Sequence, residues 1–424
     1  MKFTPALFAH AEAALAALLR FDYPADAVLS RYFREHRELG HADRGFVAET
    51  CFAVLRRLRS LSARCDGEAS PRRLLLAALF CLRGWNLKML APVAREADAT
   101  WLAAAKGMKD GEWPAAVRRD LPDWLDERLL ARFGSEIEAL STALNRPAPL
   151  DLRVNPLKTT REAVLARLAA DGIDAEACTF SPLGVRLADK PALSRHPLFL
   201  AGDIEVQDEG SQLLGFLVAP KRGEMVADFC AGAGGKTLLL GALMRSTGRL
   251  YAFDVSEKRL ANLKPRLARS GLSNVHPLRI ESESDQKVKR LAGKFDRVLV
   301  DAPCSGLGTL RRNPDLKWRQ TPESVAELMI MQGNILAAAA RLVKPGGRLV
   351  YATCSLLAEE NDGVVEAFLA AHPDFSPLAA AEILDRQGIS LAGRESAPSG
   401  DDALRLLPHV HGSDGFFALA MERR

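Results

Sequence analysis

The chain has 424 residues and a formal net charge of +4, with 48% hydrophobic and 26% charged residues. This composition is ordinary for a globular protein, and the length suggests two or three domains. The sequence contains no apolar stretch of the roughly 18 residues that span a bilayer and no signal-peptide pattern at its start, which excludes a membrane partner and predicts a cytoplasmic protein. The small net charge is no evidence of nucleic-acid binding by itself.

Residues 1–140 are predicted to form a helical domain. Alanine and leucine dominate from Pro5 to Leu19, and apolar residues from Phe46 to Leu58 recur at helical spacing. This part of the chain also carries a cluster of arginines in a stretch poor in acidic residues, which makes it a candidate basic surface. The cluster comprises Arg56, Arg57, Arg59, Arg64, Arg72 and Arg73. The alternative is a helical bundle that only supports the rest of the protein.

A proline-rich break at residues 145–149 ends the helical pattern. Beyond it, Leu152 to Lys158 has the pattern of a strand, Thr160 to Asp171 that of a helix, and Gly184 to Leu187 that of another strand. This alternation predicts a small α+β subdomain over residues 146–220.

Residues 221–424 are predicted to form an α/β domain. Strand and helix patterns alternate through Val226, Phe253, Leu278, Val298 and Val350, which favours a mostly parallel sheet with ligands at the carboxyl ends of its strands. The Gly-, Ser- and Asp-rich stretch from about 385 to 402 is expected to be a loop, to which no function is assigned.

A glycine-rich turn follows the first strand of this domain, over Cys230 to Lys236. Such a turn lets a ligand approach backbone amides at a helix N-terminus. A P-loop is excluded because Cys230 stands where that motif requires its first glycine. About 20 residues later Asp254 ends the next strand, where nucleotide-binding folds place a carboxylate on ribose hydroxyls. The two features together indicate a nucleotide-like cofactor.

Cys304 and Cys354 each follow a predicted strand, in the segments DAPCSG and YATCS. A thiol must be activated before it acts as a nucleophile, and two thiols at neighbouring strand ends would supply two chemical roles. The alternative is that they are small buried apolar residues. All seven cysteines are scattered without a C-x-x-C pair, which argues against disulfides and against a structural metal site.

The chain from about residue 147 resembles the RsmB/Sun-type RNA (cytosine-5) methyltransferases, which use S-adenosylmethionine. The matching segments are DFCAGAGGKT, the Asp254 strand end with Arg259, DAPCSGLGTLRRNPDLKW, YATCSLLAEEN and HGSDGFF. The resemblance implies a class I methyltransferase fold, Rossmann-like with a mostly parallel seven-stranded sheet and a closing antiparallel strand after Asp414. The run from His41 to Leu61 resembles a helix of the NusB-like RNA-binding domain that some members carry.

The resemblance also implies roles for the thiol loops. Cys354 would be the nucleophile that adds to carbon 6 of cytosine, Cys304 would assist release by helping to remove the carbon 5 proton, and Asp301 would stabilise charge near the ring and the cofactor. DNA cytosine methyltransferases use the cysteine of a similar PC loop instead, so the assignment has to be tested by mutating the two thiols separately.

By the same resemblance, S-adenosylmethionine would contact the glycine-rich turn and a set of acidic and basic residues. The expected contacts are Cys230, Ala231, Gly232, Ala233, Gly234, Gly235, Lys236, Asp254, Arg259, Glu281 and Asp301. Glu281 is the expected cofactor contact at the end of the third strand, and Glu283 or Asp285 could serve instead. The alternative for each is an acidic residue of a solvated turn without a binding role.

RNA contacts are expected at Arg153 and Asn155, for which interdomain packing is the alternative, and at Arg311 and Arg312 beside the PCS loop. Trp318 is expected to pack rather than to stack on a base. The resemblance implies a monomeric enzyme that makes 5-methylcytosine, most simply in ribosomal RNA that is unpaired or in an assembly intermediate. A transfer RNA or DNA substrate, or a non-catalytic ribosome-assembly factor that binds RNA, are the alternatives.

Overall fold

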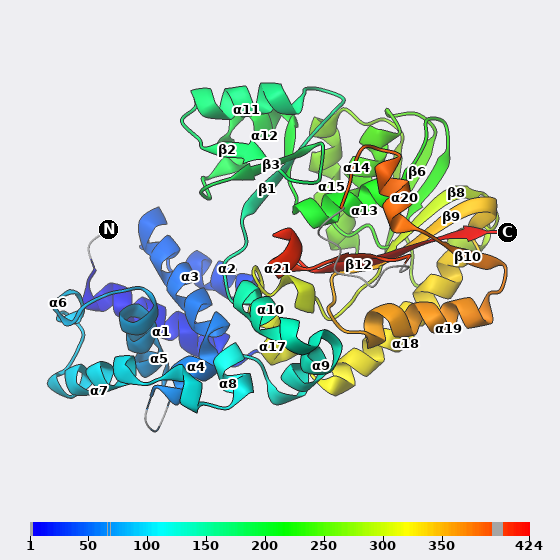
Figure 1. Cartoon of the computed structure of the whole chain (residues 1–424). Coiled ribbons are helices and arrows are strands. Elements are labelled where there is room, and N and C mark those ends of the chain that lie inside the picture. Colours follow the sequence, from blue (N-terminus) through cyan, green and yellow to red (C-terminus); the bar gives the residue numbers. More distant parts are fainter. Residues whose placement is uncertain (1–2, 66, 68, 392–401) are drawn as a thin grey trace. The chain divides into compact units, whose positions relative to one another are not determined.

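The computed structural model describes residues 3–65, 67, 69–391 and 402–424, and most of the predicted loop near 385–402 lies outside them. The chain divides into two compact units (Figure 1). One unit comprises Met1–Pro147 with Thr309–Pro322, and the other comprises Ala148–Gly308 with Glu323–Arg424. The short segment 309–322 therefore groups with the helical region, whereas the sequence analysis assigns it to the C-terminal domain. Within the described residues, no helix combines the length and the apolar character needed to cross a bilayer.

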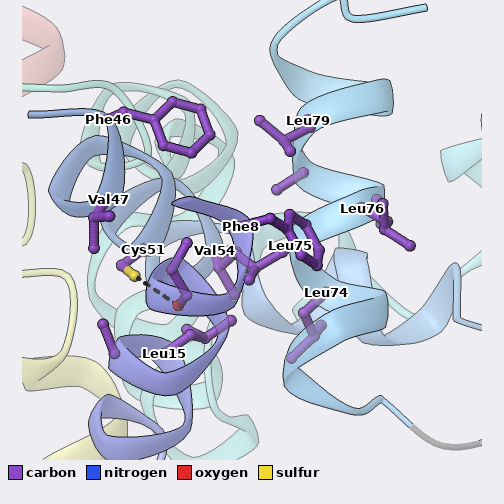
Figure 2. Close-up of a cluster of buried hydrophobic side chains, with 14 of the residues drawn as sticks. Phe8, Leu15, Phe46, Val47, Cys51, Val54, Leu74, Leu75, Leu76 and Leu79 are labelled. Carbon is purple, nitrogen blue, oxygen red and sulfur yellow. Dashed lines mark hydrogen bonds between the residues drawn. The ribbon is translucent and has the colours of Figure 1, made fainter. Parts of the chain in front are cut away.

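The helical unit is built around α1 (Pro5–Leu18), α3 (His41–Arg56) and α5 (Pro71–Ala77). Their apolar side chains form one buried cluster, in which the Cys51 thiol donates a weak hydrogen bond to the Ala11 carbonyl (Figure 2). Its other α-helices are α2 (Ala25–Glu35), α4 (Leu58–Ala63), α6 (Leu87–Leu90), α7 (Glu96–Gly107), α8 (Ala115–Arg119), α9 (Asp123–Phe133), α10 (Ile137–Leu144) and α17 (Leu316–Arg319).

The arginine cluster of this unit does not form a free basic surface. Arg56 donates to the carbonyl oxygen of Arg311 at 3.1 Å, and Arg57 pairs with the buried Asp120 at 2.9 Å. The other four cluster arginines each donate to backbone carbonyls of the same unit. This corrects the expectation of a basic surface at these positions, because their guanidinium groups connect helix ends and loops inside the unit.

The segment 309–322 is held among the helices by its own polar side chains. Lys317 donates to the Arg56 carbonyl at 2.9 Å and to Asn145 Oδ1 at 3.1 Å, and Trp318 Nε1 donates to the Leu55 carbonyl at 2.7 Å. Burial lowers the pKa of Lys317 to about 7. Trp318 thus packs within the unit, as the sequence analysis expects.

In the second unit, a small antiparallel sheet has the strand order β2-β3-β1-β4. Its strands are β1 (Leu150–Val154), β2 (Ala175–Ala177), β3 (Gly184–Leu187) and β4 (Ile204–Val206), and its helices are α11 (Arg161–Ala170) and α12 (Pro197–Ala201). The first strand ends before Pro156, which has no backbone N–H for a ladder bond, and the Thr160 hydroxyl caps α11 by accepting from Ala163 N. The predicted α+β subdomain forms.

The large sheet has the order β10-β12-β9-β8-β5-β6-β7, with the short β11 paired to β12. Strands β9, β8, β5, β6 and β7 are parallel, and β12 is antiparallel to both β9 and β10. The predicted mostly parallel seven-stranded sheet is confirmed, and β11 adds an eighth strand. The bounds are β5 (Met225–Asp228), β6 (Arg249–Asp254), β7 (Val275–Arg279), β8 (Phe295–Asp301), β9 (Val343–Thr353), β10 (Phe375–Leu378), β11 (Leu404–Leu406) and β12 (Phe416–Arg423).

Helices cover both faces of this sheet, as Figure 1 shows for α13, α14 and α15 on one face and α18 and α19 on the other. Each face buries an apolar cluster, so the strands are almost continuously apolar, as expected for a parallel sheet covered on both sides. The bounds are α13 (Glu209–Val218), α14 (Gly235–Leu243), α15 (Glu257–Ser270), α16 (Gln286–Lys289), α18 (Pro322–Ala340), α19 (Val364–Ala371), α20 (Ala380–Asp385) and α21 (Pro408–His411).

Candidate active site

The carboxyl ends of four neighbouring strands carry the predicted residues Asp254, Asp301 and Cys354, together with Asp228, which the sequence analysis does not identify. Asp228 ends β5, Asp254 ends β6, Asp301 ends β8, and Cys354 follows β9 directly. Because these strands are parallel and adjacent in the order β9-β8-β5-β6, their carboxyl ends meet at one edge of the sheet. The structure thus brings together residues that lie up to 126 positions apart in the chain, as the numbers of Asp228 and Cys354 show.

The glycine-rich turn is tied to the strands on both sides of β5. Phe229 N donates to the Leu299 carbonyl at 2.8 Å, and Ala231 N donates to the Phe253 carbonyl at 2.9 Å. Gly234 has a φ of +82°, and a Cβ there would lie 2.1 Å from a methyl group of Leu263. A Cβ on Gly232 would meet nothing within 4 Å, so this face of the turn is open to a ligand.

Asp254 fixes the turn from the next strand. It is 5% exposed, and its two carboxylate oxygens accept from Gly232 N at 2.8 Å and from Ser256 N at 2.7 Å. Arg259 lies exposed in the first turn of α15. The Cys230 thiol has its pKa raised well above the usual value, chiefly by burial and by the nearby carboxylates, whereas Arg259 acts in the opposite direction.

The three acidic candidates after β7 differ in what they contact. Asp285 caps α16, because its oxygens accept from Glu281 N at 2.9 Å and from Lys287 N at 2.8 Å. These backbone hydrogen bonds lower the pKa of Asp285. Glu281 is exposed and Glu283 half-buried. Because Asp285 already caps α16, Glu281 and Glu283 are the simpler candidates for contact with the cofactor.

Lys236 and Asp301 form an ion pair beside the thiols, with 2.7 Å between Nζ and Oδ2. Burial opposes the charge of Lys236, but Asp301 and the nearby Cys354 together raise its pKa above the usual value. The surrounding charges thus favour the ammonium form of Lys236 near Cys354.

Asp228 is buried behind this pair. Thr237 donates to its Oδ2 at 2.7 Å, and its Oδ1 has no hydrogen-bond partner among the described residues. Burial raises the pKa of Asp228 to about 7. An acceptor buried without a partner, beside an open glycine, is a feature that a bound ligand can satisfy.

The two predicted catalytic thiols face each other, with 3.4 Å between their sulfur atoms. Their interaction, together with burial, raises the pKa of Cys304 well above the usual value. The loops are fastened by Gly308 N, which donates to the Cys354 carbonyl at 2.8 Å, and by Gly415 N, which donates to the Gly308 carbonyl at 2.8 Å. A Cβ on Gly308 would lie 2.2 Å from the Gly415 carbonyl oxygen, so only glycine fits this crossing.

Glu360 is a site residue that the sequence analysis does not identify. It is fully buried in the π-helical turn Glu359–Gly363, and it accepts hydrogen bonds from the serines next to both thiols, Ser305 and Ser355. The available signal is an acidic residue six positions after Cys354, inside the segment YATCSLLAEEN.

Arg153 and Asn155 are placed by the structure inside the second unit. Arg153 is 3% exposed and donates to the carbonyl oxygen of Gly235, at the start of α14, at 2.7 Å, and also to Gln207. Asn155 is also buried and donates to the carbonyl oxygens of Gly202 and Ser270 at 3.0 and 2.9 Å. These contacts favour the packing alternative, because both side chains are buried and hydrogen-bonded within the unit, and the proposed RNA contact is left to experiment.

Arg311 and Arg312 belong to the helical unit, as part of the segment 309–322. Both side chains are half-buried, and they follow the PCS loop in the chain within four residues of Gly308. The structure therefore groups them with the helices and not with the predicted thiols.

The strand order of the large sheet, with its antiparallel β12 and a glycine-rich turn at the carboxyl edge, defines a methyltransferase of class I. A family profile described as 16S rRNA methyltransferase RsmB/F matches residues 215–422, and one described as the RsmF/B-like ferredoxin-like domain matches residues 121–194. The chain belongs to the RsmB/F family of rRNA methyltransferases and is an enzyme of this type.

Individual relatives agree with this assignment. The chain is 35% identical to the probable ribosomal RNA small subunit methyltransferase B of Synechocystis sp., over 95% of this chain and 96% of that protein. It is 35% identical to ribosomal RNA small subunit methyltransferase B of Sodalis glossinidius, over 90% of each. The crystal structure of a methyltransferase homolog protein from Pyrococcus horikoshii is similar with a TM-score of 0.63 and 31% identity, over 73% of this chain and 97% of that chain.

Proposed function

We propose that this enzyme transfers a methyl group from S-adenosylmethionine to carbon 5 of a cytosine in ribosomal RNA. The observation that carries the proposal is the pair of sulfur atoms 3.4 Å apart at the carboxyl edge of a class I methyltransferase sheet. The relatives named as small-subunit rRNA methyltransferases support ribosomal RNA as the substrate.

The residues around the glycine-rich turn fit the cofactor. Gly232 leaves open space, Asp228 Oδ1 is a buried acceptor without a partner among the described residues, and Asp254 lies where a ribose is expected. S-adenosylmethionine, when bound, supplies an electrophilic methyl group. The residues proposed to hold it are the turn from Cys230 to Lys236, together with Asp254, Arg259, Glu281 and Asp301.

Cys354 is the proposed nucleophile. The Lys236 side chain, whose pKa is raised in part by Cys354, brings a positive charge near this sulfur. When the thiolate adds to carbon 6 of the cytosine, the electron pair of the double bond moves to carbon 5, which can then take a methyl group. Removal of the proton from carbon 5 returns the electron pair to the ring and expels the Cys354 thiolate.

Cys304 is the proposed helper in that release. Its pKa is raised, so its thiolate, once formed, is a strong base beside the adduct. Asp301, which pairs with Lys236 in the same site, stabilises charge on the cytosine ring. Arg311 and Arg312 remain proposed contacts to RNA phosphates.

The two single thiol variants test this division of roles. We expect Cys354→Ala to abolish both methyl transfer and the covalent RNA adduct, because the attacking sulfur is gone. We expect Cys304→Ala to bind RNA and to accumulate the adduct, seen as a slow band on a denaturing gel. An adduct in Cys354→Ala that is lost in Cys304→Ala would reverse the roles.

The substrate is tested by incubating the enzyme with labelled S-adenosylmethionine and total RNA from a strain that lacks the gene, followed by mapping of new 5-methylcytosines. Label in ribosomal RNA is the expected result. Label only in transfer RNA would change the substrate, and no label despite cofactor binding would favour a ribosome-assembly factor.

A further inference from the structure

The two thiols are carried by separate loops, one after β8 and one after β9, which are joined by backbone hydrogen bonds and by a buried carboxylate. The residues directly after the thiols, Ser305 and Ser355, are both 1% exposed. Their hydroxyl oxygens are 3.1 Å apart and both donate to Oε2 of Glu360. One carboxylate oxygen thus joins the two loops at the positions adjacent to the sulfur atoms.

The other oxygen of Glu360 fastens the PCS loop. Oε1 accepts from Ser305 N at 2.8 Å and from Gln332 Nε2 at 2.9 Å, and the same Gln332 nitrogen donates to the Pro303 carbonyl at 2.9 Å. The backbone carbonyl of Glu360 accepts from Tyr351 of β9 at 2.7 Å. Glu360 is therefore itself held in place by the strand that leads to Cys354.

The hydrogen-bond partners of Glu360 match the acceptor capacity of a carboxylate. The four side-chain and backbone groups that bond with its carboxylate are all donors, and an ionised carboxylate accepts at about four lone-pair positions. A glutamine here would replace one acceptor oxygen by an NH₂ group that faces donors. Buried polar groups left unpaired in this way are costly.

We infer that Glu360 is a positioning residue of the methyl-transfer site, whose carboxylate holds the PCS and TCS loops so that the sulfur atoms of Cys304 and Cys354 lie side by side where the substrate base would bind. The inference rests on the proposed function for its chemistry. The contact that it describes is independent of substrate, and it is measurable in the free enzyme.

The ionisable groups near the two thiols differ. The ionisable groups that act on Cys304 are Cys354 first and then Glu360, and Cys304 in turn acts on Tyr351. The charge of Glu360 raises the pKa of Cys304, whereas Lys236 lies beside Cys354.

A substrate-free experiment tests the positioning. In the full-length enzyme, hydrogen peroxide should oxidise Cys304 and Cys354 to a disulfide, in which two thiols lose two hydrogens and peroxide becomes two waters. Peptide mass spectrometry would measure the rate. We expect Glu360→Gln to slow this disulfide about tenfold, because loops that lose the shared carboxylate less often bring the sulfurs together, a misplacement of the kind that costs up to ~100-fold in rate. Glu366→Gln, which removes an exposed carboxylate of α19, is the matched control and should match wild type.

The same variants separate positioning from folding and from binding. We expect Glu360→Gln to reduce kcat about 100-fold while KM for RNA changes less than about threefold. Iodoacetamide should also alkylate Cys304 at lower pH in Glu360→Gln than in wild type. Should that variant not fold, Ser355→Ala, which removes one donor and keeps the carboxylate, is expected to give a smaller change in the same direction.

The outcomes distinguish this inference from the proposed function. The inference would be overturned if folded Glu360→Gln had the kcat and the rate of disulfide formation of the wild type. If Glu360→Gln does not fold, the same result in Ser355→Ala would overturn it. Either outcome would leave the proposed function standing. A disulfide that depends on Glu360 in an enzyme that methylates no RNA would support the positioning of the thiols and refute the proposed function.

Discussion

At the scale of single residues, the site depends on carboxylates whose environments differ. Asp254 uses both oxygens on backbone N–H groups, Asp301 pairs with Lys236, and Asp228 is buried with one oxygen unsatisfied among the described residues. The same residue type thus serves as a loop anchor, an ion-pair partner and a buried acceptor. The sequence predicts that Asp254 belongs to the site because it ends an apolar strand, and the family resemblance implies the same for Asp301.

Asp228 should make the stability of the enzyme depend on pH. Its pKa is about 7 in the folded chain, above the 3.8 of an ordinary Asp, so the folded state retains a proton that the unfolded state releases. Its contribution is fully present below pH ~4 and is lost as the pH rises through ~7. We expect wild type to lose roughly 2–3 kcal/mol between pH 5 and pH 8 relative to Asp228→Asn.

Urea unfolding of the cofactor-free enzyme at several pH values would measure this difference. Asp385→Asn, which removes an exposed carboxyl group, is the matched control. Parallel pH curves for wild type and Asp228→Asn would show that Asp228 ionises normally in the folded chain.

At the scale of secondary-structure elements, the small sheet supports the cofactor turn. Arg153 of β1 donates to the Gly235 carbonyl, at the first residue of α14, and Asn155 joins the end of β1 to the end of α15 through Ser270. The LRVN segment is therefore a brace between the subdomain and the methyltransferase sheet. The sequence analysis treats its polar residues as candidate RNA contacts because the sequence does not show whether an arginine is buried or exposed.

Removal of the Arg153 brace should weaken cofactor binding. We expect Arg153→Met to lower the affinity for S-adenosylmethionine about three- to tenfold and the stability by ~1–3 kcal/mol, because the Gly235 carbonyl and Gln207 lose their donor while the aliphatic volume is kept. Isothermal titration calorimetry without RNA would measure the affinity. Arg195→Met, at an exposed position, is the control. An unchanged cofactor affinity together with weakened RNA binding would instead restore the RNA role.

At the scale of the whole molecule, the chain leaves the methyltransferase unit after Gly308 and returns at Glu323. In between, Asp315, Lys317 and Trp318 bond with groups of residues 25–145. The DLKW part of the family motif thus stabilises the helical unit, although it follows a catalytic loop in the sequence.

Removal of the N-terminal helices should show that the segment 309–322 depends on them for its structure. In a protein that comprises residues 148–424, we expect the amides of 309–322 to exchange with solvent at nearly unprotected rates, because every partner named above has been removed. In the full chain these amides should be protected. Hydrogen exchange followed by mass spectrometry would measure both, with α13 as an internal reference that stays protected. Equal protection of the segment in the two proteins would show that it folds with the methyltransferase unit.

The sequence by itself determined the class of sheet, the cofactor turn and the two thiol loops of this enzyme. Apolar strands that end in Asp254, Asp301 and Cys354 are local patterns, and parallel strands necessarily align their carboxyl ends. The tertiary structure alone decided the partners of Glu360, Arg153, Lys317 and the helical-unit arginines. Most of these side chains have at least one partner that is distant in the chain, and no local pattern records whether such a side chain is buried or where its hydrogen bonds go.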